Sequence, residues 1–261
     1  MFNRFRIGLL IPIFVFPAIH QKIKKMKKTY RIISIALVLS VLFPFPGFSQ
    51  KDLPVKLGLK VAPNICWMNP GTKNYEYDGA RLGATIGFVS DIYFAERYAF
   101  STGFNFQFLN GKLTYPDNRM KPNDTTILSG QVARKYNFIY LEIPIMIKMQ
   151  SKEFGRFSFY GQIGFGTGFR VKATADESFQ PDHGEAFDQQ YEINEATSLI
   201  RESLLIGLGF EFHIDLSSRI IFGISYSNAL NNILNGGIND KTKMNEKSTL
   251  NYIELNLGFL F

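Results

Sequence analysis

The sequence predicts an all-β fold: an eight-stranded antiparallel up-and-down transmembrane β-barrel preceded by a signal peptide. Three observations predict it. Apolar residues alternate with small or polar ones in eight segments of about ten residues, the pattern of strands with one face on lipid. The connections between these segments alternate between short and long. The chain also holds 26 Phe and 12 Tyr against one Trp.

The net charge of +7 comes from the front of the chain. Residues 1–49 hold eight basic residues and no acidic one, and the remainder has 21 basic and 22 acidic residues. A basic patch that binds nucleic acid would require the excess charge on the folded part of the protein. We therefore expect no nucleic-acid partner.

Residues 26–49 read as a signal peptide. A basic start is followed by an apolar core at 32–43 and by the small residues Gly47 and Ser49 before a cleavage site. A membrane anchor is the alternative, but its core would need about 20 apolar residues. Residues 1–25 contain a second apolar run, so we predict that the true start is Met26, that 1–25 is a misassigned extension, and that 50–261 is the barrel domain.

The eight strands follow from period-two alternation, in which successive side chains point to opposite faces. Their apolar positions place the strands at 55–61, 82–88, 100–108, 139–147, 157–171, 204–214, 220–226 and 253–261. The opposite parity is rich in glycine, serine and asparagine and runs in the fifth strand from Ser158 to Arg170 and Lys172. The interior of an eight-stranded barrel is filled by side chains, so small residues must alternate there with long ones.

The connections predict the orientation. Those at 96–97, 150–155 and 215–218 are short, whereas those at 66–79, 110–135, 173–199 and 229–250 are long and polar. Outer-membrane barrels have tight periplasmic turns and long external loops. We expect an outer-membrane location with both termini periplasmic, and an aromatic belt beside the short turns at Tyr93, Phe94, Tyr98, Phe100, Phe157 and Phe159.

A soluble barrel or sandwich with a ligand cavity alternates in the same way, with its apolar side inward. Its other face should then be strongly charged, whereas here that face is Gly, Ser and Asn. The terminal Phe261 also resembles the aromatic signal that the outer-membrane insertion machinery reads. The membrane barrel is therefore favoured, with Phe261 as its assembly signal.

The charged residues of inward parity predict a packed ion-pair network that fills the lumen, because an unpaired charge at low dielectric is costly. A conducting pore is the alternative, but eight strands leave little room for one. The network residues and one nearby histidine are Lys60, Arg81, Glu142, Lys148, Arg170, Arg201, Glu211, His213, Arg219 and Glu254. Pro144 removes a ladder donor from a strand of a closed barrel, so we expect a β-bulge there.

No motif predicts catalysis or a cofactor. The acidic segment around His183 lacks the spacing of a calcium loop, and the glycines of 161–168 lie in a strand with no helix after them. Glu211 and His213 share one face and form the best acid/base pair, but plugging the lumen is the simpler role for them. Cys66 is alone and cannot form an internal disulfide. We expect no catalytic, metal or cofactor-binding residue.

Five features of the chain are distinctive: the signal peptide, KLGLK at 56–60, YLEIP at 140–144, the glycine-rich fifth strand and the terminal Phe261. Together they resemble the PorT-like outer membrane β-barrel proteins of Bacteroidetes. YLEIP is the most specific, and the resemblance covers residues 50–261. It implies an eight-stranded outer-membrane barrel and carries over no catalytic residue.

We expect a non-enzymatic structural or interaction role through the long external loops. One alternative is a component assisting protein secretion across the outer membrane, since PorT itself is associated with type IX secretion. A barrel enzyme acting on lipid or peptide is the other. The expected partners are outer-membrane lipid, the insertion machinery during assembly, and secretion-system or surface partners.

Overall fold

The computed structural model describes residues 55–120, 126–215, 218–234 and 246–261. The predicted signal peptide at 26–49 and the extension at 1–25 lie outside these residues. No helix in the described part is long and apolar enough to cross a membrane.

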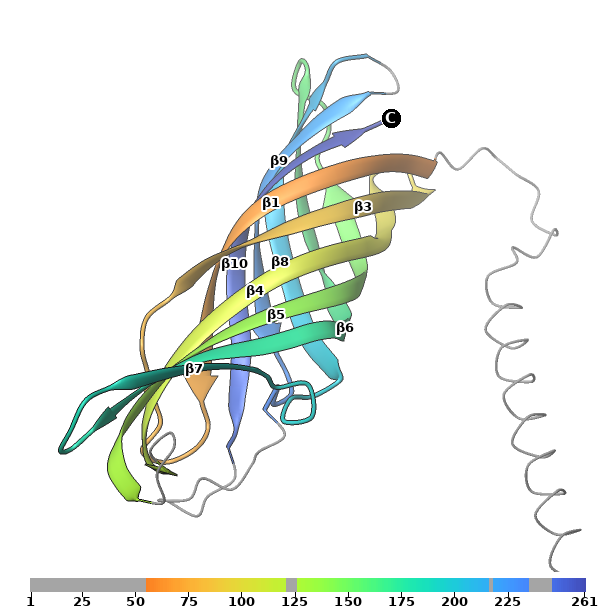
Figure 1. Ribbon diagram of the computed structural model, residues 1–261. Helices are drawn as coiled ribbons and strands as arrows, with labels where there is room; N and C mark the ends of the chain where they lie inside the picture. The colour runs from red at the N-terminus through yellow and green to blue at the C-terminus, as the bar shows by residue number, and fades with distance from the viewer. Residues whose placement is uncertain (1–54, 121–125, 216–217, 235–245) are drawn as a thin grey trace, which may run out of the picture. The chain divides into compact units, whose positions relative to one another are not determined.

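Eight long strands pair antiparallel in chain order, and the last pairs with the first, so the sheet closes into a barrel (Figure 1). This confirms the predicted fold class. Two short strands, β2 and β7, are additional to the eight. The strands are β1 (Val55–Pro70), β2 (Glu76–Tyr77), β3 (Arg81–Ala95), β4 (Tyr98–Met120), β5 (Ile127–Gln150), β6 (Phe157–Pro181), β7 (Phe187–Glu192), β8 (Ile200–His213), β9 (Arg219–Ala229) and β10 (Ser248–Leu260).

The predicted alternation appears as burial. On β4, Phe104, Phe106 and Phe108 point outward and are exposed, while Asn105 and Gln107 between them are buried. All eight barrel strands carry such exposed apolar residues. Contact between water and a continuous apolar belt of this size is unfavourable, whereas contact between such a belt and the lipid hydrocarbon core is favourable.

The short connections, the start of β1 and the end of β10 lie at one end of the barrel, here called the turn end (Figure 1). Phe261 lies there, 55% exposed, and its backbone N–H donates to the carbonyl of Leu57 at 2.8 Å. The opposite end is called the extension end, because several strands continue past the apolar belt there.

The predicted long loops at 110–135 and 173–199 are mostly strand, so that part of the prediction was wrong. Strand β4 runs on to Met120, β5 begins at Ile127, and β6 continues to Pro181, where β7 pairs with it. The outer face of this extension is polar, with Asn110, Lys112 and Thr114 following the belt residue Phe108 on β4. These outward polar side chains resemble loop residues in the sequence, because only the residues between them, which point into the barrel, are buried.

A β-bulge in β6 changes which residues face inward. Ile139 pairs with Lys172 but Tyr140 pairs with Arg170, so Val171 is the extra residue. Beyond it the inward positions become Ala173, Ala175, Glu177 and Phe179. Lys172, predicted to face the lumen, is exposed. The extra residue reverses the alternation that the sequence pattern extrapolates.

Pro144 is accommodated by a gap in the ladder, and the expected bulge at that residue is absent. Between β4 and β5 the pairs Thr102–Ile145 and Asn105–Glu142 keep one register with no pair recorded between them. The hydroxyl of Thr102 donates to the Pro144 carbonyl at 2.8 Å. Opposite lies Gly103, whose φ of 145° favours glycine, and a Cβ there would meet the Phe88 carbonyl oxygen at 1.9 Å.

Candidate functional site

The interior of the barrel holds three groups of charged side chains at successive levels. We call them the turn-end cluster (Asp91, Lys148, Glu211, Arg219), the middle cluster (Lys60, Glu142, Arg201, Glu254) and the extension cluster (Arg119, Arg134, Glu177 and Glu246, with the neutral Tyr191).

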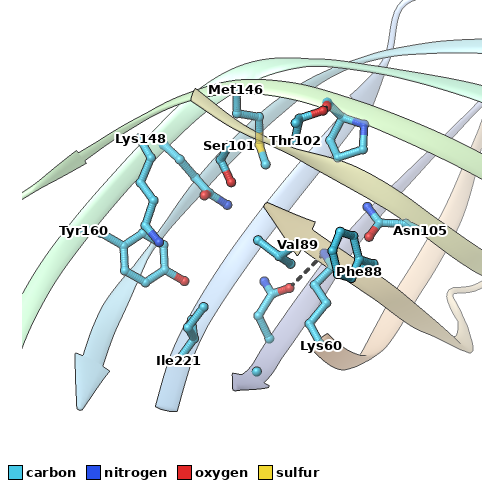
Figure 2. Close-up of a pocket in the computed structure, with 14 residues that line it drawn as sticks. Lys60, Phe88, Val89, Ser101, Thr102, Asn105, Met146, Lys148, Tyr160 and Ile221 are labelled. Carbon is cyan, nitrogen blue, oxygen red and sulfur yellow. Dashed lines mark hydrogen bonds between the residues drawn. The ribbon is translucent and has the colours of Figure 1, made fainter. Parts of the chain in front are cut away.

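Lys148 is the centre of the turn-end cluster. Its ammonium lies 2.6 Å from Asp91 and 2.5 Å from Glu211, and Arg219 reaches the other oxygen of Glu211 at 2.8 Å. Lys148 is 2% exposed, and the side chains of both its acids are fully buried. The ring of Tyr160 lies 4.7 Å from the ammonium, a favourable cation–π distance (Figure 2). One buried cation thus joins strands β3, β5 and β8.

The middle cluster contains two pairs. Lys60 lies 2.9 Å from Glu254 and also donates to Asn256 at 3.2 Å. The guanidinium of Arg201, whose side chain is fully buried, lies 3.4 Å from Glu142. Arg201 also donates to the Ser227 hydroxyl at 2.8 Å and to the Leu250 carbonyl at 3.0 Å.

Gly166 makes room for the pair of Glu142 and Arg201. A Cβ on Gly166 would lie 2.8 Å from the Glu142 carboxylate, so a larger residue on β6 would displace the acid. This explains at one position why the inward face of β6 is glycine-rich.

Three of the predicted network residues have other surroundings. Arg81 has no recorded acidic partner within the described ranges, and its Nη1 is buried without a hydrogen bond. Arg170, beside the bulge, donates to the hydroxyl of Thr197 at 2.8 Å and to its carbonyl. His213 does not pair with Glu211, since Glu211 belongs to the turn-end cluster.

His213 instead joins two other polar side chains. Its Nε2 lies 2.9 Å from the Ser158 hydroxyl and its Nδ1 lies 3.2 Å from Glu153 of the β5–β6 turn. Serine hydrolases use the same order of contacts. Ser158 is only 2% exposed, whereas a nucleophile must reach its substrate, so we interpret these contacts as fixing the turn against β8.

Above the middle cluster the interior is apolar and aromatic, which the sequence pattern did not predict. Tyr115, Tyr136 and Phe138 are almost fully buried and belong to one core cluster with Ile233 and Leu250. The predicted inward face of glycine, serine and charge thus holds only for the part of the barrel within the apolar belt. Tyr93, predicted for the aromatic belt, is likewise buried, and its hydroxyl donates to Gln150 at 3.0 Å.

The extension cluster is built around Arg134. Its guanidinium lies 2.8 Å from Glu177 and 3.4 Å from Glu246, and Arg119 lies 3.0 Å from Glu177. The Arg134 guanidinium also lies 5.1 Å from the ring centre of Tyr115 and 5.8 Å from that of Tyr191. Burial raises the pKa of the Tyr191 phenol, so it remains a donor to Glu177.

Two connections between strands are fixed at the extension end, one through this cluster and one on the outer face. Tyr75, between β1 and β2, donates its hydroxyl to Glu246, which precedes β10, at 2.9 Å, and its ring stacks on Tyr115 at 4.3 Å. On the outer side, hydrogen bonds from Lys112 and Thr114 lower the pKa of Asp78, which ties the start of β3 to β4. The extension end is therefore closed by packed side chains.

Replacing Arg134 with methionine is expected to loosen the extension and leave the barrel folded. The change leaves Glu177 and Glu246 without their buried guanidinium, at a local cost of about 3 kcal/mol. Limited proteolysis should then cleave residues 182–199 faster than in the parent protein, at unchanged heat-modifiable gel mobility. Arg156→Met, in the exposed β5–β6 turn, is the control. Equal cleavage rates in all three proteins would contradict the role of Arg134.

The spaces between the clusters are small. One cavity of about 40 Å³ lies between Lys60 and Lys148, with Tyr160 and Met146 on its wall (Figure 2), and another of about 20 Å³ lies beside Glu142. They have room for a few water molecules at most. A larger space of about 400 Å³ opens at the turn end and is lined by Lys56, Gln150 and Arg219 among others.

A closed ring of eight antiparallel strands, an exposed apolar belt and a polar, filled interior together define a membrane-spanning β-barrel. The family model of the outer membrane protein beta-barrel domain matches residues 48–235. The chain belongs to this family and is an outer membrane β-barrel protein.

Solved structures of small outer-membrane proteins resemble the chain in fold. Neisserial surface protein A has 11% identity and a TM-score of 0.41, over 79% of this chain and 95% of its own. Ail of Yersinia pestis, solved with the heparin analogue sucrose octasulfate, has 12% identity and a TM-score of 0.34, over 79% of this chain and 99% of its own. OprG of Pseudomonas aeruginosa has 13% identity and a TM-score of 0.33, over 79% of this chain and 95% of its own. No curated protein matches the chain.

Proposed function

We propose that this protein is a non-enzymatic outer-membrane barrel that acts as a structural or interaction protein through its extension end, and that this end faces the outside of the cell. The observation that carries the proposal is the extension itself. Residues 110–120 of β4 alone continue for about 35 Å past the belt. A wall of that length has no use in spanning the membrane.

The extension offers a preformed polar surface. Its outer face has a hollow of about 640 Å³ lined by Lys112, Lys135, Asp176 and Gln190 from four adjacent strands. Its inner face is buried against the tyrosines and Arg134. Because strands hold this surface in place, a partner would not have to order a loop on binding.

The orientation rests on the difference between the two ends. The connections at the turn end span two to six residues, the length of periplasmic turns, whereas at the extension end 18 residues join β9 to β10 and the chain forms the additional strands β2 and β7. Both termini of the barrel domain are then periplasmic.

The decisive test is accessibility on intact cells. An epitope inserted at residues 182–186, the exposed tip of the β6–β7 hairpin, is expected to bind antibody without permeabilisation. The same epitope inserted at 151–155, in the β5–β6 turn, serves as the matched control and should bind only after the outer membrane is opened. Labelling of the turn insert alone on intact cells would reverse the orientation and overturn the proposal.

The finer assignment to the PorT-like proteins of Bacteroidetes stays a prediction based on YLEIP and the accompanying stretches. A role in protein secretion likewise stays an alternative, and a deletion strain with an intact surface proteome would count against it. The barrel enzyme loses its best acid/base pair, because Glu211 is bound by Lys148 and Arg219.

A further inference from the structure

The space at the turn end differs from the other cavities in the hydrogen-bonding groups on its wall. It is open to solvent, measures about 400 Å³ and lies below the turn-end cluster. Three polar atoms of its lining residues are buried and have no hydrogen-bond partner in the described structure: Lys56 Nζ, Gln150 Nε2 and Arg219 Nε. All three are N–H donors.

Lys56 is the least expected of the three. It is only 8% exposed, and no acid lies within ion-pair distance of it among the described residues. The other cations of the barrel interior show how a buried charge is usually accommodated, since Lys60 and Lys148 each have a carboxylate within 3 Å. An ammonium buried without such a partner is costly, and a bound anion would remove that cost.

The wall of this space has an excess of positive charge. Lys56, Arg97, Lys152 and Arg219 line it, against Glu96 and Glu153. Glu153 already contacts His213, and Arg219 binds Glu211 through Nη1, while its Nε has no hydrogen-bond partner in the described structure. A ligand that satisfies Lys56, Gln150 and Arg219 together must offer several acceptor oxygens and negative charge.

We propose that the turn-end space is a binding site for a phosphate group, held by Lys56, Arg219 and the amide of Gln150. Phosphate presents several acceptor oxygens, and arginine and lysine are its usual ligands. The volume accepts a group larger than the bare ion, of the size of a phospholipid headgroup or a small phosphomonoester. This site is at the opposite end from the extension and does not depend on the proposed surface role.

The test uses the full barrel domain folded in zwitterionic detergent and titrated with inorganic phosphate in chloride buffer, followed by calorimetry. Saturable binding is expected. Lys56→Gln should weaken it about tenfold or more, the effect of losing one hydrogen bond to a charged group. Gln150→Met removes a donor without changing the charge and should weaken binding less. Lys135→Gln, which removes the same charge at the extension end, should leave binding unchanged.

A second titration distinguishes the source of the phosphate. Micelles containing phosphatidylglycerol are compared with micelles containing phosphatidylcholine only. Binding that requires phosphatidylglycerol, and that Lys56→Gln abolishes, assigns the site to a lipid headgroup. Binding of the free ion alone assigns it to a soluble phosphate. No saturable binding in either titration, or equal weakening by Lys56→Gln and Lys135→Gln, overturns the proposal; heat-modifiable mobility verifies that every variant is folded.

Discussion

Lys148→Met is expected to destabilise the folded barrel more than the loss of any other charge in the interior, by about 5 kcal/mol. The ammonium is the buried partner of both Asp91 and Glu211. Methionine fills a similar volume but leaves Asp91 without a cation and Glu211 with Arg219 alone. The cost is therefore that of a buried charge left uncompensated, which exceeds the value of the lost ion pairs.

The measurement is urea unfolding of the barrel in lipid vesicles, monitored by gel mobility without heating. Lys152→Met, the same change four residues along in the exposed β5–β6 turn, is the control and should shift the midpoint little. Asp91→Asn added to Lys148→Met should recover part of the loss, because one of the stranded charges is removed. A midpoint for Lys148→Met equal to that of Lys152→Met would contradict the role of the turn-end cluster.

Glu142→Leu has the second largest expected effect, a loss of about 3 to 5 kcal/mol. Among the described residues, it leaves the fully buried guanidinium of Arg201 with only the Ser227 hydroxyl and the Leu250 carbonyl as acceptors. We expect the substitution to impair folding and not a transport function. The same unfolding assay measures it, with Glu185→Leu in the exposed β6–β7 turn as the control.

A double variant separates the two contributions. Arg201→Met alone leaves Glu142 buried with one weak donor in the described part of the chain, Asn105 at 3.3 Å. Glu142→Leu with Arg201→Met removes both charges and should be more stable than either single variant, because apolar pairs often replace buried ion pairs at no cost. If the two losses simply add, Glu142 and Arg201 do not act as a pair.

The sequence predicted the barrel because period-two alternation reports directly which side chains face lipid. Glu142 and Lys148 in the stretch YLEIPIMIK could be assigned to the interior from parity alone, and both are buried there. The partners of Glu142 and Lys148 could not be predicted, because pairing across the lumen depends on the stagger between strands. The spacing of residues within one strand contains no information about that stagger. Arg81, Arg170 and His213 were grouped with the ion pairs for this reason.

The extension could not be predicted from the alternation for a different physical reason. Outside the belt the outer face of a strand meets water and the inner face becomes a protein core, so the polarity of both faces reverses. Lys112 and Lys135 then resemble loop residues, and Tyr115 and Tyr136 resemble scattered aromatics. The signal that could have predicted these strands is the alternation of polar with apolar residues, the apolar ones being Leu113 and Tyr115 in 110–120 and Val132, Tyr136 and Phe138 in 130–138.

The extra residue at Val171 has a consequence for how this chain tolerates insertions and deletions. Everything in β6 after that point has its inner and outer faces set by a single added residue. Deleting Val171 would join Arg170 to Lys172 in a regular ladder and leave Ala173 and Ala175 facing inward, and several residues gained or lost at 182–186 would alter only a surface turn. Pairing without the bulge while Val171 is kept would instead turn Ala173 and Ala175 toward water and bring Lys172 and Asp176 into the aromatic core. The length of this chain is therefore loosely constrained at two places about ten residues apart, the bulge inside β6 and the surface turn that follows the strand.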